Sequence, residues 1–192
     1  MNSSNEIEIL ERISQSVRAV QDRLLRAVTA LESAGISYAL TDDNAVAAWV
    51  GQIDESAVRN TPDVTIVIRR NDLDTAVKAL ISSRFIAHSE TPNLFVDDST
   101  VRHGVQLFVT GERIISASPA VHPDVAESEM LGSFRVLPLL ALVQIKLAPF
   151  RDRDRLNLRD LIDVGLIDQT WPARYPAELA ARLQLLLDTP GG

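Results

Sequence analysis

The residues best suited to chemistry are acidic and amide side chains beside three apolar stretches of the chain. Asp42 and Asp43 follow the first stretch, Asp63 and Thr65 open the second, and Gln106 lies within the third. Oxygen atoms of this kind are the ligands that Mg²⁺ takes in proteins. Side chains two residues apart on a strand face the same side, so Asp63 and Thr65 should point together. The pattern therefore directs attention to these five positions as candidates for binding a cation or a phosphate.

Two of these acids also have simpler interpretations. Asp43 precedes a short helical pattern, and capping that helix is the role we favour for it. Asp63 follows Pro62 at the start of a strand. It is therefore either a metal ligand or a loop carboxylate that accepts hydrogen bonds from nearby N–H groups, and the sequence leaves both open.

Lys146 is a further candidate, because it lies inside an otherwise apolar helical stretch. A buried ammonium needs a partner or a route to water. We favour a buried salt bridge with Asp160 or Asp163 over a contact with a bound phosphate. The three histidines show no ligand spacing, so we expect no histidine metal site; they are His88, His103 and His122.

Helical and strand patterns alternate along the chain and predict an α/β (α+β) fold. A long helix is expected first, over residues 5–33, with a break near residues 14–16 as one option. Further helices are expected over residues 44–50, 71–82, 139–148, 153–166 and 177–187. Strands are expected over residues 36–40, 64–68, 85–88, 94–96, 101–109, 113–115 and 134–136.

This order predicts a mixed sheet flanked by helices, followed by a helical appendage. We divide the chain into an N-terminal helical extension (1–19), an α/β core (20–116) and a mainly helical C-terminal region packed on the core (117–192). Residues 64–68 are apolar on both faces, which is typical of a central strand.

Composition narrows the classes of function. The net charge is −7 and the pI is about 4.9, so we do not expect nucleic-acid binding. No apolar stretch is long enough to span a bilayer, and cysteine is absent, so we expect a cytoplasmic protein.

Four stretches, taken in order, resemble a known superfamily. They are residues 36–45 (ISYALTDDNA), 59–68 (RNTPDVTIVI), 104–109 (GVQLFV) and 139–165 (LLALVQIKLAPFRDRDRLNLRDLIDVG). They resemble the nucleotidyltransferase superfamily of the polymerase-beta type, and within it the small bacterial branch of abortive-infection toxins and minimal nucleotidyltransferases. The resemblance implies a nucleotidyltransferase-like sheet, a Gly-Gly turn before a helix, and three carboxylates on two strands that hold Mg²⁺ for nucleotidyl transfer.

The chain departs from that pattern at the residues that would carry the chemistry. Asp42 and Asp43 stand where the family has Gly-Gly, and Thr65 and Gln106 stand where it has carboxylates. Of the implied metal ligands, Asp63 alone keeps its charge. Two like charges about 5 Å apart, at an effective dielectric of about 20, repel by roughly 3 kcal/mol, so Asp42 and Asp43 should oppose a triphosphate. The resemblance therefore implies a degenerate active site, with Lys146 near the position of the phosphates.

Three hypotheses for function follow. The first is a pseudoenzyme that serves as a binding or interaction module, for example in a toxin–antitoxin or regulatory pair, with no cofactor. The second is an active Mg²⁺-dependent nucleotidyltransferase with a rearranged site that recruits Asp97 or Asp98, and the third is a nucleotide sensor. We expect a protein partner, or a second copy of the chain, to bind through the N-terminal helix.

Overall fold

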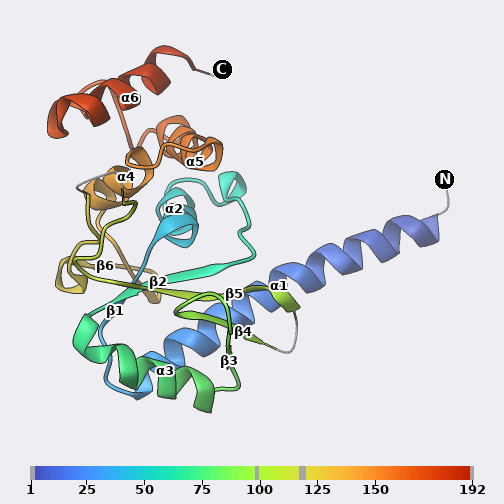
Figure 1. Cartoon of the computed structure of the whole chain (residues 1–192). Coiled ribbons are helices and arrows are strands. Elements are labelled where there is room, and N and C mark those ends of the chain that lie inside the picture. Colours follow the sequence, from blue (N-terminus) through green and yellow to red (C-terminus); the bar gives the residue numbers. More distant parts are fainter. Residues whose placement is uncertain (1–2, 98–99, 117–119, 191–192) are drawn as a thin grey trace.

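The computed structural model describes residues 3–97, 100–116 and 120–190. Its centre is a seven-stranded mixed sheet with strand order β3-β4-β5-β2-β1-β7-β6 (Figure 1). The strands are β1 (Tyr38–Leu40), β2 (Val64–Ile68), β3 (Ile86–Ala87), β4 (Leu94–Asp97), β5 (Thr100–Val109), β6 (Glu129–Leu131) and β7 (Phe134–Val136). The mixed α/β fold predicted from the sequence is confirmed.

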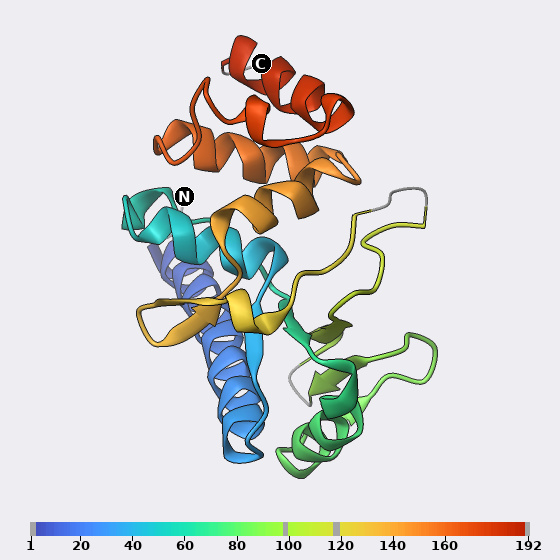
Figure 2. The same ribbon diagram turned by 90° about the vertical axis from the view of Figure 1, so that its left-hand side faces the viewer.

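Helices cover both faces of this sheet. They are α1 (Ser3–Ser33), α2 (Asp42–Gly51), α3 (Leu73–Ser82), α4 (Leu139–Leu147), α5 (Asp152–Asp163) and α6 (Ala177–Asp188). Helices α1 and α3 lie on one face, whereas α2, α4 and α5 lie on the other, with α6 outermost (Figures 1 and 2). The candidate residues belong to the second of these layers or to the strands beneath it.

Strand β2 lies in the middle of the sheet order, and all five of its residues are buried. It pairs antiparallel with β1 and parallel with β5, and in the second pairing Thr65 lies directly opposite Gln106. Paired residues in neighbouring strands face the same side of a sheet. The two positions that the family resemblance links are therefore neighbours, and Asp63 lies just before β2, two residues before Thr65.

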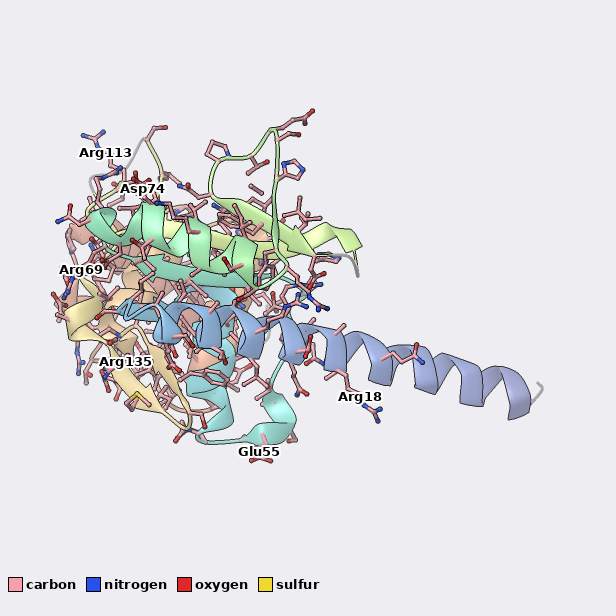
Figure 3. All side chains as sticks on the ribbon, turned by 90° about the horizontal axis from the view of Figure 1, so that it is seen from below. Arg18, Glu55, Arg69, Asp74, Arg113 and Arg135 are labelled. Atoms are coloured by element: carbon pink, nitrogen blue, oxygen red, sulfur yellow. The ribbon has the colours of Figure 1, made fainter. Side chains whose placement is uncertain are left out.

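Helix α1 is continuous, so the suggested break near residues 14–16 is wrong. Its second half is packed on the sheet, with Ala27 and Leu31 fully buried. Its first half extends beyond the rest of the domain, and Arg18 lies on this projecting part (Figures 1 and 3). The apolar residues that pack the second half of α1 on the sheet thus recur at the same spacing in its projecting first half, beside which no other described helix or strand lies.

Three other local predictions differ from the structure. Helix α2 begins at Asp42 with Thr41 in the N-cap position, so Asp43 is not the cap but part of the first turn. The expected strand at residues 113–115 is only an isolated bridge between Arg113 and Val121. Strand β6 was not foreseen; it is short and pairs only with β7, at the edge of the sheet. The proposed domain divisions stay predictions.

No helix within the described residues is long and apolar enough to cross a membrane.

Candidate functional site

The start of α2 carries Asp42 and Asp43, the two acids that stand where the family resemblance implies Gly-Gly. Thr41 is extended, and Asp42 follows with a φ of +53°, in the left-handed region that glycine adopts without cost. Aspartate tolerates this region better than most other residues do. The backbone therefore keeps the conformation that suits a glycine, while the side chain adds a carboxylate.

That carboxylate binds Lys146. The lysine lies on α4 and its side chain is fully buried, yet its ammonium donates hydrogen bonds to Asp42 Oδ1 and, at 2.7 Å, to Asp43 Oδ1. Asp154 Oδ1 lies 3.7 Å from the same nitrogen. A buried cation is stable only with such compensation.

The predicted partners of Lys146 are therefore wrong. Asp160 is the partner of Arg59, whose Nε lies 2.9 and 2.8 Å from its two carboxylate oxygens. Asp163 has no ion pair with Lys146 among the described residues. The partners of Lys146 come instead from the start of α2 and from the start of α5.

Arg153, on α5, completes the cluster from the solvent side. Its guanidinium donates to Asp43 Oδ2 and, at 3.3 Å, to Thr61 Oγ1. Burial opposes ionisation of Asp43, but the charge and hydrogen bonds of Lys146 and Arg153 outweigh it and lower the pKa of this carboxyl. Asp43 is therefore charged at neutral pH and matched by cations.

The remaining acid of the cluster has its own partner. Asp154 is almost completely buried and accepts hydrogen bonds from the backbone N–H of Arg151, at 3.0 Å, and from its Nε, at 2.9 Å. Three carboxylates thus face three cations. We call the residues Asp42, Asp43, Lys146, Arg151, Arg153 and Asp154 the ion cluster. The expected repulsion between these two aspartates and a triphosphate is reduced accordingly, because the charges of Asp42 and Asp43 are compensated within the protein.

The other positions of the family pattern are also engaged. Thr65 donates through Oγ1 to the carbonyl of Thr41, at 2.9 Å, and its backbone N–H donates to Asn44 Oδ1, at 2.7 Å. Gln106 donates through Nε2 to the carbonyls of Pro92 and Leu107, both at 3.1 Å. Each side chain satisfies a structural hydrogen bond.

Asp63 is partly exposed to solvent. Its Oδ1 lies 3.2 Å from His103 Nδ1 and accepts a hydrogen bond from the backbone N–H of Gly104 at 3.4 Å. Both side chains are about two-fifths exposed, at 37% for Asp63 and 40% for His103. This arrangement matches the loop-carboxylate interpretation, and the metal-ligand interpretation stays a prediction.

The structure also locates one of the two alternative acids. Asp97 is buried and forms ion pairs with Arg23, at 3.3 Å, and with Arg26. Asp98 lies outside the described residues. No group of three or more histidine, cysteine or acidic side chains within the described part of the chain is arranged to hold a metal ion. The donor set of Thr65, Gln106 and Asp63 does not fit a two-metal centre, because it has one charge and its neutral members are hydrogen-bonded elsewhere.

A pocket adjoins the ion cluster between α2, α5 and the segment that leads into β2. Its volume is about 210 Å³. The lining residues are Asp43, Val46, Ala47, Val50, Ala57, Arg59, Asn60, Thr61, Pro62, Arg153, Leu156, Asn157 and Asp160. We call it the α2–α5 pocket. Sequence reasoning identified Asp43 alone as a site residue here, because the others come from separate segments and none carries a recognisable spacing.

No protein-family model matches the chain, and no curated protein sequence matches it. Among solved structures, the crystal structure of JHP933 from Helicobacter pylori is similar with a TM-score of 0.53 at 10% identity, over 91% of this chain and 92% of that one. The solution structure of the antibiotic-resistance factor ANT(2'')-Ia is similar with a TM-score of 0.45 at 9% identity, over 86% of this chain and 80% of that one. At 10% identity the likeness to JHP933 concerns the mixed α/β fold alone.

Proposed function

We propose that this protein is a non-catalytic relative of the nucleotidyltransferases that serves as a binding module. The observation that carries the proposal is the fully buried Lys146, held by Asp42 and Asp43 at the first turn of α2. The start of a helix attracts anions through its free N–H groups and its dipole. Here two carboxylates of the chain itself take that place.

A triphosphate would have to compete with these carboxylates for the same lysine. The ammonium has no exposed surface, and both acids lie within hydrogen-bonding reach of it. Displacing them would take both hydrogen-bonded carboxylates from the lysine and would bring the negative charge of the phosphate close to them, and like charges at such distances repel by a few kcal/mol, roughly. This competition disfavours phosphate binding in the family's manner.

Metal binding is disfavoured for a separate reason. Two-metal catalysis needs carboxylates that bridge both ions. Thr65 and Gln106 supply neutral oxygens, and the Thr65 hydroxyl donates to the Thr41 carbonyl. Asp63 is the remaining charge on that side of the sheet, and a single carboxylate is a weak site for Mg²⁺, which would keep most of its waters.

The rearranged enzyme finds less support than the binding module. Asp97 would have to leave two arginines, Arg23 and Arg26, before it could bind a metal. A nucleotide sensor would still need the phosphate position that Asp42 and Asp43 occupy, unless it recognised the base alone.

Isothermal titration of the full chain with ATP and GTP in millimolar Mg²⁺ tests the proposal. We expect no binding tighter than about 100 µM, which corresponds to roughly −5.5 kcal/mol. A parallel assay with labelled nucleotides should detect no transfer. Micromolar affinity that is lost in an Asp63→Asn variant would overturn the proposal, because it would show a working metal–nucleotide site.

A further inference from the structure

We propose that the projecting half of α1 pairs antiparallel with the same segment of a second copy of this chain, in a register centred on residue 15. The proposal concerns self-association and goes beyond the proposed binding role. Helix α1 has 31 residues, and its first half extends past the rest of the domain (Figures 1 and 3). Helices in proteins gain most of their stability from packing, so a projecting half with an apolar face calls for a surface to pack on.

Apolar residues recur along α1 alternately three and four positions apart, which is the spacing of a coiled coil. The series runs through three heptads and consists of Leu10, Ile13, Val17, Val20, Leu24, Ala27 and Leu31. We call it the α1 stripe. Its last two members are fully buried against the chain's own sheet. Val17 and Val20 are only partly buried, so apolar surface of the stripe remains where α1 leaves the sheet.

The residues that flank the stripe suit a second copy of the same helix. In a coiled coil, charges at the two flanking positions of each heptad decide which helices pair. Over the projecting part of α1 these positions hold Ile7, Ile9, Ser14, Ser16 and Gln21, all of them uncharged. Two copies therefore meet without repulsion between like charges, and no charge at these positions selects a different partner.

Charge and shape both favour the antiparallel orientation. Residues 3–16 contain three glutamates and one arginine, whereas residues 17–26 contain three arginines and one aspartate. An antiparallel pair brings the acidic part of each helix to the basic part of the other, and a parallel pair would set like charges side by side. Arg23 and Arg26 also pair with Asp97, which reduces this contribution. The stronger argument is the sheet, which lies on the side of the stripe in each copy, so a parallel pair would bring both sheets into the same space.

The stripe also fixes the register of the pair. An antiparallel coiled coil sets the two alternating positions of the stripe opposite each other, layer by layer. With residue 15 on the twofold axis, Leu10 lies opposite the partner's Val20, and Ile13 lies opposite the partner's Val17. Counted from both helices, this register gives four consecutive apolar layers, in which both copies use the same surface.

The neighbouring registers are less favourable. Sliding the helices by one heptad toward their N-termini would place Glu6 opposite Val17, so a carboxylate would enter an apolar layer. Sliding them by one heptad in the other direction would place Leu10 opposite Ala27, which the chain's own sheet already covers. The register centred on residue 15 fills its layers with apolar residues and leaves the sheet in place.

Sedimentation equilibrium of the full chain tests the association. Four layers make a small interface, so we expect a reversible dimer with a dissociation constant on the order of 10 µM. Ile13→Glu places a carboxylate in two of the four layers and should raise that constant about tenfold or more. The matched control is Gln15→Glu, which adds the same charge at an exposed position outside the stripe and should change the constant by less than about threefold. Circular dichroism of the diluted proteins checks that both variants keep the fold.

A distance measurement tests the orientation. The chain contains no cysteine, so Ser4→Cys allows one spin label to be attached to each copy. In the antiparallel register the two labelled positions lie about 33 Å apart along the pair, from the rise per residue of a helix. In a parallel pair they would lie side by side, about 10 Å apart. Double electron–electron resonance on the dimer distinguishes the two separations.

The proposal is overturned if the full chain stays monomeric at about 100 µM, if Ile13→Glu and Gln15→Glu have equal effects, or if the labels lie side by side. A monomeric chain would leave the α1 stripe to a different protein. None of these outcomes depends on the titration with Mg²⁺–ATP. Nucleotide binding with a metal would defeat the proposed function, whereas a monomeric chain would defeat only the pairing of α1.

Discussion

Stability measurements on the ion cluster test the arrangement around Lys146 most directly. We expect the double substitution Asp42→Asn and Asp43→Asn to lower the free energy of unfolding by about 3–5 kcal/mol, because it removes both hydrogen-bonded anions of a buried cation. Asp154 offsets only part of this loss, since its Oδ1 lies 3.7 Å from the ammonium, beyond hydrogen-bonding distance. Its carboxylate also accepts two hydrogen bonds from Arg151.

Replacing the lysine instead of the two acids should lower the free energy of unfolding by less. In Lys146→Met each acid keeps some compensation, because Asp43 retains Arg153 and Asp42 is 25% exposed to water. We expect a loss of about 1–2 kcal/mol, less than the 3–5 kcal/mol, roughly, of a stranded buried charge, because these acids are paired or reach water. The triple variant with all three changes should be more stable than the double variant, with a coupling of about 2–3 kcal/mol.

Urea denaturation followed by the fluorescence of Trp49 and Trp171 measures these differences by linear extrapolation. The matched control is Asp160→Asn, which also removes a carboxylate from an arginine pair. The partner here is Arg59, which is 59% exposed, so water replaces the lost contact and we expect a change of about 1 kcal/mol or less. If Lys146→Met costs as much as the double variant, or if the triple variant is simply additive, the cluster does not hold a buried charge as described.

Three further predictions concern the same fold. Because the native state lowers the pKa of Asp43, the ionised carboxylate stabilises the fold at pH values above its ordinary pKa of 3.8. This contribution is lost as the pH falls below 3.8 and through the lowered pKa, so the difference in unfolding free energy between wild type and Asp43→Asn should shrink in acid. Thr65→Asp with Gln106→Asp should bind Mn²⁺ in an EPR titration where wild type does not, because the two new carboxylates lie directly opposite each other on β2 and β5. Asp63→Ala should weaken that binding, since Asp63 lies two residues before one of them. Removing residues 1–16, the projecting half of α1, should convert a dimer to a monomer in light scattering without loss of helical packing; a monomeric full chain would contradict association between copies through this helix.

The sheet was predictable from the sequence because its central strands carry their own signal. Residues 64–68 are apolar at every position, and the structure gives β2 the same bounds. Strand β6 carries no such signal, since Glu129 and Met130 are exposed at the sheet edge. The neighbour relation between Thr65 and Gln106 could not come from periodicity; it followed from the family resemblance, and the parallel pairing of β2 with β5 agrees with it.

The site was less predictable because its contacts join distant parts of the chain. Lys146 could be recognised as a buried cation in an apolar helix, but its partners lie 104 and 103 residues earlier. A nearby helix offered Asp160 and Asp163, and sequence gives no means of knowing which neighbour approaches the lysine. Asn157 is a clearer case still: its side-chain Oδ1 is buried without a hydrogen-bond partner in the described part of the chain, and such a property of packing leaves no pattern in the sequence.

The exchange of Gly-Gly for Asp42 and Asp43 links the fold to the loss of function that we propose. The family resemblance implies a lysine near the phosphates of a nucleotide, and in our proposal Lys146 on α4 is that lysine. Such a lysine in a fully buried setting needs negative charge at all times, whether or not a ligand is bound. Two aspartates at the start of α2 supply that charge permanently, and the left-handed backbone at Asp42 is retained despite the side chain it now carries. In our proposal the two aspartates therefore stabilise the empty state at the expense of phosphate binding, and the acidic pair acts as a built-in substitute for the ligand.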